Sequence, residues 1–203
     1  MYSVEDKILT SVKKCGRGKV FFSSEFLRYG TAKRINKALE LLSEKGLLMR
    51  VARGLYCYPK QEKIYGLGAV PPMVEEIASA IARRDASRVV PTGEWAQYQL
   101  GLTQQIPMNI VYLTDGTSRT IELLDGRKIK FKHSASKNFA FNDRTAMLVT
   151  SALKSIGKGN ITDELVNVLD AVLSSKNVSF SLDLHLMPEW VRKIIQDRYE
   201  KIS

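Results

Sequence analysis

Residues 31–59 constrain the fold more than any other part of the chain, and their sequence is TAKRINKALELLSEKGLLMRVARGLYCYP. Apolar residues recur here at three- and four-residue spacing, which places them on one stripe of an amphipathic helix. These positions are Ile35, Ala38, Leu39 and Leu42. Thr31 can cap the first turn with its hydroxyl, and Gly46 suits the left-handed position that ends a helix. The segment predicts a helix that stops at Gly46 and leads directly into a β-hairpin.

The polar face of this helix is asymmetric, because its cations lie in the first half and its anions come later. The residues outside the apolar stripe are Lys33, Arg34, Asn36, Lys37, Glu40 and Glu44. Recognition helices of DNA-binding proteins usually place their N-terminal half in the major groove, so this order favours DNA binding. Cations near a helix N-terminus also oppose the helix dipole, which slightly favours a functional role for them. An ordinary solvated helix face remains the alternative.

The preceding segments supply two more predicted helices. Apolar spacing over residues 4–12 indicates a short amphipathic helix. Phe21 and Phe22 then introduce the segment SSEFLRYG, in which Ser23 or Ser24 can act as the cap. Gly30 would form the turn between the second helix and the third.

The hairpin after Gly46 has two short strands at residues 47–51 and 55–58, both rich in strand-favouring residues. Ala52, Arg53 and Gly54 make the tight connection between them. Three helices followed by such a wing predict a winged helix-turn-helix. The candidate DNA-binding residues are Ser23, Ser24, Thr31, Lys33, Arg34, Asn36, Lys37, Arg50 and Arg53.

The distribution of charge supports this interpretation. The 203-residue chain has a net charge of +10, and residues 1–66 contain 14 Lys and Arg against 6 Asp and Glu, a net of +8. A positive excess confined to one module is typical of a nucleic-acid-binding protein, whereas a merely soluble basic surface is the alternative. Pro and Gly between Pro59 and Pro72 predict a boundary, with Ile64, Tyr65 and Leu67 in either a packed or a flexible connection. We therefore expect a DNA-binding domain over residues 1–62 and a C-terminal domain over residues 63–203.

The C-terminal region has the pattern of a mixed α/β domain with a helical end, so the predicted fold class is α+β overall. Helices are expected at residues 73–86, before Gly101, and at 144–156, 163–173 and 188–201. Strands are expected at residues 88–90 and 110–114, and a hairpin with an Asp-Gly turn joins residues 120–124 to 128–131. Thr162 is the expected cap of the helix that follows it.

Catalytic patterns are scarce. His133 and His185 are the two histidines in the sequence, and Cys15 and Cys57 lie outside any CxxC pair, so we expect no metal site, no cofactor and no disulfide framework. A metal-dependent nuclease site could be drawn from Asp115, Glu122, Asp125 and Lys128. Asp115 and Asp125 each precede a glycine, however, and turn formation explains them more simply. We expect the protein not to be an enzyme.

Two further features bear on partners and location. Arg127, Lys128, Lys130 and Lys132 form a basic stretch that could contact nucleic acid or a protein, although a solvated strand face with alternating residues is the simpler explanation. The sequence contains no apolar run near the roughly 20 residues needed to cross a bilayer, and its first residues do not resemble a signal peptide. We expect a cytoplasmic protein that does not bind membranes.

Two blocks of this sequence resemble the AbiEi-type antitoxins, which are transcriptional regulators of type IV toxin-antitoxin and abortive phage-infection systems. The first block comprises Phe21 and Phe22, the Gly30-Thr31 turn, Ala38-Leu39 with Leu42, Gly46, and the hairpin RVARGLYCYP. The second comprises PTGEWAQYQLGLTQQIP and the strand ending in YLTDGT. The resemblance covers most of residues 1–133, and the helical remainder carries no matching motif.

The resemblance implies that the N-terminal domain represses its own operon by binding inverted repeats in double-stranded operator DNA. It also implies that the C-terminal region supplies antitoxin activity against a nucleotidyltransferase-like toxin encoded nearby. Direct binding of the toxin is not required in a type IV system. The alternative from the residues alone is a stand-alone winged-helix regulator whose second domain senses a ligand or oligomerises.

Overall fold

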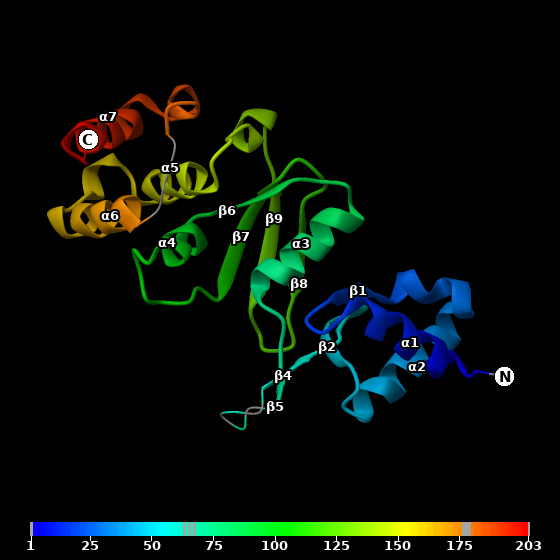
Figure 1. The fold of residues 1–203 in the computed structure, drawn as a ribbon. Coiled ribbons are helices and arrows are strands. Elements are labelled where there is room, and N and C mark those ends of the chain that lie inside the picture. Colours follow the sequence, from blue (N-terminus) through cyan, green and yellow to red (C-terminus); the bar gives the residue numbers. More distant parts are fainter. Residues whose placement is uncertain (1, 63, 65, 67, 176–179, 203) are drawn as a thin grey trace. The chain divides into compact units, whose positions relative to one another are not determined.

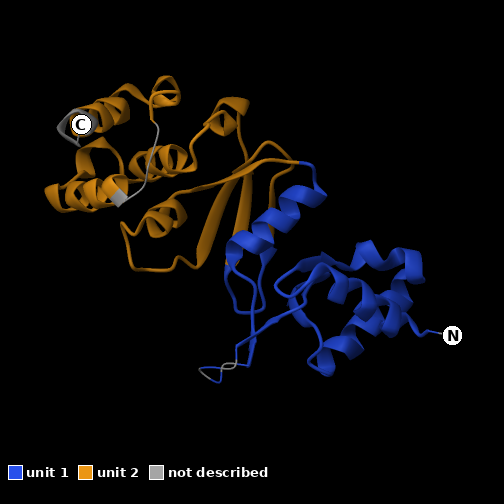
Figure 2. Ribbon diagram, viewed as in Figure 1, with its two compact units in different colours: residues 1–86, 121–127 blue, residues 87–120, 128–203 orange. Residues whose placement is uncertain are grey.

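The computed structural model describes residues 2–62, 64, 66, 68–175 and 180–202. The chain divides into two compact units, each described separately below and coloured separately in Figure 2. Unit 1 comprises Met1–Ala86 and Ile121–Arg127, and unit 2 comprises Ser87–Thr120 and Lys128–Ser203. Unit 1 therefore continues past residue 62, where the sequence predicts a domain boundary. Whether residues 1–62 form an independent domain stays a prediction.

The first part of unit 1 has the predicted three helices and hairpin, with an additional strand at Val20–Phe22 that the sequence did not predict (Figure 1). Its elements are α1 (Val4–Cys15), β1 (Val20–Phe22), the 3₁₀ helix η1 (Ser23–Tyr29), α2 (Ala32–Glu44), β2 (Met49–Ala52) and β3 (Leu55–Cys57). The three strands form an antiparallel sheet in the order β1-β3-β2. The Thr31 hydroxyl accepts the Arg34 N–H at 3.5 Å, and Gly46 adopts a left-handed φ of 67°, so both predicted ends of α2 are confirmed.

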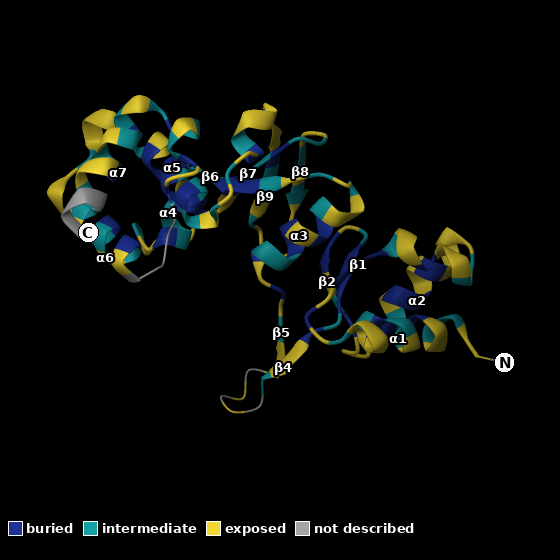
Figure 3. Cartoon of the chain, turned by 45° about the horizontal axis from the view of Figure 1, so that its top comes forward, coloured by how far each residue is buried: buried dark blue, intermediate teal, exposed yellow. Residues whose placement is uncertain are grey.

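Apolar periodicity correctly predicts the core of this part. The buried stripe of α2, which runs from Ile35 to Leu42, packs with Ile8 and Val12 of α1 and with Phe26 of η1. The buried positions on both helices appear dark blue in Figure 3. Burial of this stripe leaves the opposite, polar face of α2 open to solvent.

The second predicted helix differs from expectation in type and in capping. Residues 23–29 form the tighter 3₁₀ helix η1. Neither Ser23 nor Ser24 caps it, because Ser23 is already the first helical residue. Glu25 takes that role instead, since its carboxylate accepts the backbone N–H of Phe22 at 2.7 Å. A charged acceptor thus satisfies the N–H of the residue before the helix, whereas a serine cap would have accepted an N–H from the first helical turn.

The predicted linker region contains a small hairpin. β4 (Lys60–Glu62) and β5 (Gly68–Val70) pair in antiparallel register, with Ile64 highly exposed between them. Tyr65 and Leu67, which the sequence places in a packed or flexible connection, lie outside the described residues.

Helix α3 (Val74–Arg84) completes the compact part of unit 1 by packing near β1. Its Arg84 guanidinium lies 4.0 Å from the ring centroid of Phe22, and its Glu76 carboxylate pairs with Lys60 at 2.9 Å. These contacts explain why the unit extends to Ala86.

Residues 121–127 also belong to unit 1 by their contacts. The backbone N–H of Leu124 donates to the Val51 carbonyl at 3.0 Å, and Leu123 forms a β-bridge with Ala52. The outer edge of β2 is therefore paired, which protects it from pairing with another chain.

Unit 2 is built around a mixed sheet. Its strands are β6 (Val89–Thr92), β7 (Asn109–Thr114) and β9 (Lys128–His133), and β8 (Arg119–Glu122) adds to β9 across the predicted hairpin. The order is β6-β7-β9-β8, with β6 and β7 antiparallel and β7 and β9 parallel. Pro91 is tolerated because β6 is an edge strand.

Helices supply the rest of unit 2. They are α4 (Glu94–Leu100), η2 (Ser136–Phe139), α5 (Arg144–Ile156), η3 (Lys158–Asn160), α6 (Asp163–Ser175), η4 (Leu184–Leu186) and α7 (Glu189–Ile202). The predicted bounds of α5 are confirmed, as is the Thr162 cap, whose hydroxyl accepts the Leu165 N–H at 3.3 Å. Among the described residues, no helix combines the length and apolarity needed to cross a membrane.

A buried carboxylate ties the start of α5 to a later loop. Asp183 has no exposed surface, and its two oxygens accept the backbone N–H groups of Asn142 at 2.9 Å and Asp143 at 2.7 Å. One of these oxygens also accepts the Asn142 side-chain amide at 2.9 Å. Burial by itself raises the pKa of Asp183, but the donated hydrogen bonds outweigh it and hold this pKa below its usual value.

Candidate nucleic-acid interface

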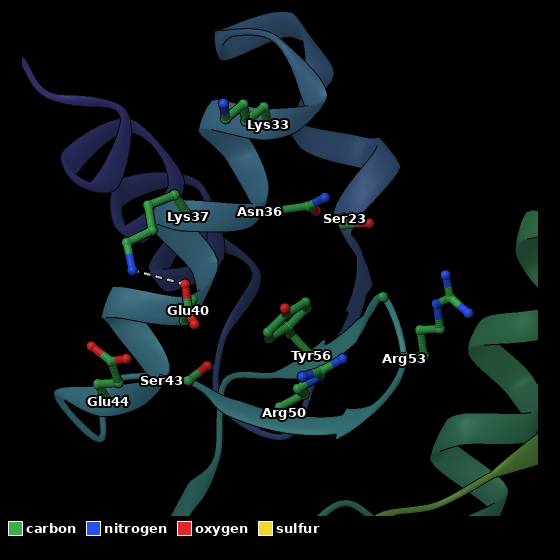
Figure 4. A pocket seen from close by; sticks show the side chains of 11 residues that line it. Ser23, Lys33, Asn36, Lys37, Glu40, Ser43, Glu44, Arg50, Arg53 and Tyr56 are labelled. Atoms are coloured by element: carbon green, nitrogen blue, oxygen red, sulfur yellow. Dashed lines mark hydrogen bonds and ion pairs between the residues drawn. The ribbon is translucent and has the colours of Figure 1, made fainter.

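An open groove of about 970 Å³ lies between α2 and the β2–β3 hairpin of unit 1 (Figure 4). Most of its lining side chains are polar or charged. The lining residues are Ser23, Lys33, Asn36, Lys37, Glu40, Ser43, Glu44, Arg50, Arg53, Gly54 and Tyr56. The groove thus joins the exposed face of the predicted recognition helix to the predicted wing.

One side of this groove is formed by the exposed face of α2. Lys33, Asn36, Glu40 and Glu44 follow one another at three- or four-residue spacing and Lys37 is adjacent to Asn36, so all five lie along one face of α2. This face is opposite the buried stripe, and all five residues are exposed. In Figure 4 the Asn36 side chain extends from the middle of this face toward Ser23. An amide at this position can both donate and accept hydrogen bonds.

The hairpin forms the other side, and its turn requires a glycine. Gly54 has a φ of 70°, and a Cβ added there would meet the Ser23 hydroxyl oxygen at 3.4 Å. The Gly54 carbonyl accepts the backbone N–H of Ser23 at 3.0 Å, which fixes the start of η1 against the turn. Arg50 lies opposite Tyr56 in the strand register, and the register shifts between Arg50 and Ala52. Such a bulge reorients the residues that lead into the turn, including Arg53.

The charges in the groove are unevenly balanced. Lys37 pairs with Glu40 at 2.9 Å, and this hydrogen bond, with the attraction of the carboxylate, raises the pKa of Lys37. Both side chains are more than half exposed, at 62% and 57%, so the pair adds little to stability. Lys33, Arg50 and Arg53 make no ion pair within the described part of the chain. The later half of α2 therefore contributes two carboxylates, from Glu40 and Glu44, against the single cation of Lys37, whereas Lys33, Arg50 and Arg53 are cations without an ion pair in the described part of the chain.

The structure brings together six of the nine predicted DNA-binding residues. They are Ser23, Lys33, Asn36, Lys37, Arg50 and Arg53. The other three lie outside the groove: Ser24 is exposed on η1, Thr31 caps α2, and Arg34 is exposed on a different side of that helix. The sequence interpretation missed Glu40, Glu44 and Tyr56 as lining residues. Helical spacing from Asn36 and Lys37 could have identified the two glutamates.

The basic stretch at residues 127–132 does not act as one group. Arg127 lies in the turn, where its guanidinium pairs with Asp125 at 2.6 Å. Lys128, Lys130 and Lys132 lie on β9 and alternate with buried residues, as expected for a strand face. The use of residues 127–132 as a contact surface for nucleic acid or a protein stays a prediction.

Two of the three carboxylates considered for a nuclease site, Asp115 and Asp125, are engaged by arginines. Asp115 accepts the Arg88 backbone N–H at 2.7 Å and the Arg88 Nε at 2.8 Å, and these bonds lower the pKa of Asp115. The side-chain hydrogen bond from Arg127 likewise holds the pKa of Asp125 below its usual value. Within the described ranges, no group of three or more His, Cys, Asp or Glu residues could hold a metal ion.

The histidines and cysteines occupy ordinary structural positions. His133 Nδ1 lies 3.0 Å from the Gly116 carbonyl, which can only accept, so this nitrogen carries the proton. His185 lies in η4. Cys15 is exposed, and burial raises the pKa of the Cys57 thiol to about 11, which makes Cys57 a poor nucleophile at neutral pH.

Residues 7–179 match the model of DUF6088, which is described as a family of unknown function. The chain belongs to this family. A comparison with proteins of curated function finds no match. The DUF6088 match includes the whole groove as well as most of unit 2, and its description assigns no activity to either. The function must therefore be argued from the geometry of the groove.

Proposed function

We propose that the first part of unit 1 is a winged helix-turn-helix and that its groove binds double-stranded DNA. The element order α1-β1-η1-α2-β2-β3 and the sheet order β1-β3-β2 support this assignment. In it, α2 is the recognition helix, η1 is the preceding helix, and the β2–β3 hairpin is the wing. The observation that carries the proposal is the meeting of α2 and the hairpin at one groove that contains Lys33, Arg50 and Arg53.

The arrangement of α2 and the hairpin supports binding to a DNA duplex. A helix in the major groove and a hairpin at the adjacent minor groove enclose one sugar-phosphate strand between them. Lys33, Arg50 and Arg53, which line the groove and make no ion pair within the described residues, would neutralise phosphates of that strand and release counterions. Asn36 lies on the helix face that would enter the major groove, where an amide can make two hydrogen bonds to adenine. The groove would thus combine backbone contacts with one candidate base contact.

On the basis of the resemblance described above, we extend this proposal to an AbiEi-type antitoxin that represses its own operon. The DNA would be an operator with inverted repeats, and the functional partner would be a nucleotidyltransferase-like toxin. Unit 2 would supply the antitoxin activity, with or without direct contact with the toxin. No catalytic role is assigned to the chain.

Fluorescence anisotropy with labelled promoter DNA tests the DNA-binding proposal. The variant carrying Arg50→Gln and Arg53→Gln should bind more weakly and show a smaller dependence on salt between about 50 mM and about 200 mM. A control carrying Arg144→Gln and Lys158→Gln removes the same charge from exposed positions of unit 2 and should bind as the unaltered protein does. Equal losses in both variants would show a nonspecific charge effect and remove the groove assignment.

Growth rescue tests the antitoxin extension. Co-expression with a neighbouring nucleotidyltransferase gene should restore the growth that the toxin alone suppresses. Repression of the promoter without any rescue would contradict the antitoxin role and would favour a stand-alone winged-helix regulator.

A further inference from the structure

Unit 2 contains a pocket of about 380 Å³ between one face of its sheet and helix α5. The strand register sets Val90, Leu113 and Lys132 side by side on that face. Met147 and Lys154 line the opposite wall from α5. The volume lies near the lower end of the range of ~300–1,000 Å³ that is typical of small-molecule sites.

The charge of this pocket is uncompensated. Its charged lining residues are Lys132 and Lys154, and no carboxylate lines it. Neither ammonium group makes a hydrogen bond or ion pair to any residue that the structure describes. A pocket of the same volume in unit 1 is different, because Glu75 and Glu76 line it beside its cations. The unit 2 pocket therefore presents two cations that lack a counter-charge from the described chain.

Hydroxyl groups add hydrogen-bond donors to the same lining. Thr92 on β6 and Ser151 on α5 line the pocket, and their hydroxyls make no hydrogen bond within the described residues. The Thr150 hydroxyl is already used, because it donates to the Ala146 carbonyl at 2.8 Å. Two ammonium groups and two available hydroxyls form a donor set suited to the oxygens of a phosphate group.

Apolar side chains complete the lining of the pocket and are only partly covered. Val111, Leu113, Phe141 and Met147 all line the pocket and retain partial exposure. An aromatic ring and a thioether make favourable contacts with a planar ring system. The pocket thus combines groups that can bind an anion with apolar surface that can contact a flat body.

We propose that this pocket binds a small molecule in which one phosphate group is attached to a flat, partly apolar body, the chemistry of a nucleoside monophosphate. The phosphate carries a charge of roughly −1.5 to −2 at neutral pH, which the Lys132 and Lys154 ammonium groups match. The ring would lie against Phe141 and Met147. This site is separate from the DNA groove, because every residue that lines it belongs to unit 2.

Isothermal titration calorimetry on the full chain tests the proposal with AMP, GMP, CMP and UMP, each compared with its uncharged nucleoside and with inorganic phosphate. At least one monophosphate should bind. Its nucleoside should bind at least about tenfold more weakly, and Lys132→Gln or Lys154→Gln should each weaken the monophosphate by about tenfold. Lys137→Gln, an exposed position on η2 outside the lining, is the matched control and should leave binding unchanged.

Three results would overturn the proposal. The first is no binding by any of the monophosphates. The second is binding that survives in the double variant Lys132→Gln, Lys154→Gln. The third is inorganic phosphate, or a single-stranded oligonucleotide, that binds as tightly as the best monophosphate and loses affinity in the same variants. The titrations contain no promoter DNA and leave the groove intact, so their outcome is independent of the DNA-binding proposal.

Discussion

The polar groups of the unit 1 groove and those around Asp183 in unit 2 serve opposite purposes. In the groove, Lys33, Arg50 and Arg53 are exposed and make no ion pair within the described residues. Asp183 is fully buried, and its oxygens accept three hydrogen bonds from Asn142 and Asp143. Groups left open to solvent are available to a partner, whereas groups satisfied inside the chain stabilise the fold. Substitutions in the two regions should therefore change different measurements.

The largest expected effect is on stability, from Asp183→Ala. This change leaves the buried N–H groups of Asn142 and Asp143 without their acceptor, which should cost about 3 kcal/mol of unfolding free energy. Urea unfolding followed by circular dichroism measures this loss. Asp197→Ala, at an exposed position of α7, is the control and should cost little. DNA affinity measured below the unfolding transition should not change, and a change there would break the proposed separation of roles.

The same carboxylate should give stability a specific dependence on pH. Because the folded-state pKa of Asp183 lies below its unfolded value, its contribution is complete above about pH 4 and is lost as pH falls through the folded-state pKa. Asp183→Asn removes this titration. Its unfolding free energy, measured by urea titration, should thus fall less steeply with acid than that of the unaltered chain. If the unfolding free energies of the two proteins fell in parallel with pH, Asp183 would not be the group whose lowered pKa stabilises the fold.

The next effect is on sequence-specific binding, from Asn36→Ala. If its amide contacts a base, the change should cost about 1–3 kcal/mol with the preferred promoter sequence and much less with a scrambled duplex. Competition gel shifts measure the ratio of the affinity for the preferred sequence to the affinity for the scrambled duplex. Gln104→Ala removes an exposed amide from unit 2 and should leave that ratio unchanged. An equal loss on both duplexes would show that Asn36 contacts the backbone.

Neighbouring cations on α2 allow a finer comparison. Lys33 lines the groove and Arg34 does not, although both are exposed. Lys33→Gln should reduce the slope of log affinity against log salt by about 0.9, the value for one lost phosphate contact. Arg34→Gln should leave the slope nearly unchanged. The reverse order would place the DNA on another side of the helix.

The smallest expected effect comes from Glu40→Gln. This change removes a carboxylate from the groove and releases Lys37 from its ion pair. Affinity for scrambled DNA should rise, on the order of threefold, because repulsion of phosphate is removed. The ratio of specific to nonspecific affinity would then fall. Glu164→Gln, an exposed position of unit 2, should change neither affinity.

Local patterns allowed much of this fold to be predicted. Periodicity and end signals define α2 between Thr31 and Gly46, and they define the bounds of α5 without error. The Asp-Gly turn correctly indicated that β8 and β9 are neighbours. These elements depend on residues close in sequence, so a single sequence carries enough information for them.

The features that the sequence pattern does not indicate depend on contacts between distant segments. The edge of β2 is completed by Leu124, which lies more than seventy positions later in the chain. The extension of unit 1 to Ala86 depends on α3 contacts such as Arg84 with Phe22. For the groove, the sequence identified the cations but not Glu40 and Glu44, because the hairpin must be placed before their role as lining residues becomes apparent.

Lysine footprinting by mass spectrometry tests the central claim most directly. The full chain is acetylated with and without promoter DNA, and modification is compared at Lys33 and Lys37 in the groove and at Lys132 and Lys154 in unit 2. Bound DNA should protect the two groove lysines and leave the two unit 2 lysines as reactive as before. Protection of Lys132 and Lys154, with Lys33 and Lys37 still fully reactive, would contradict the account.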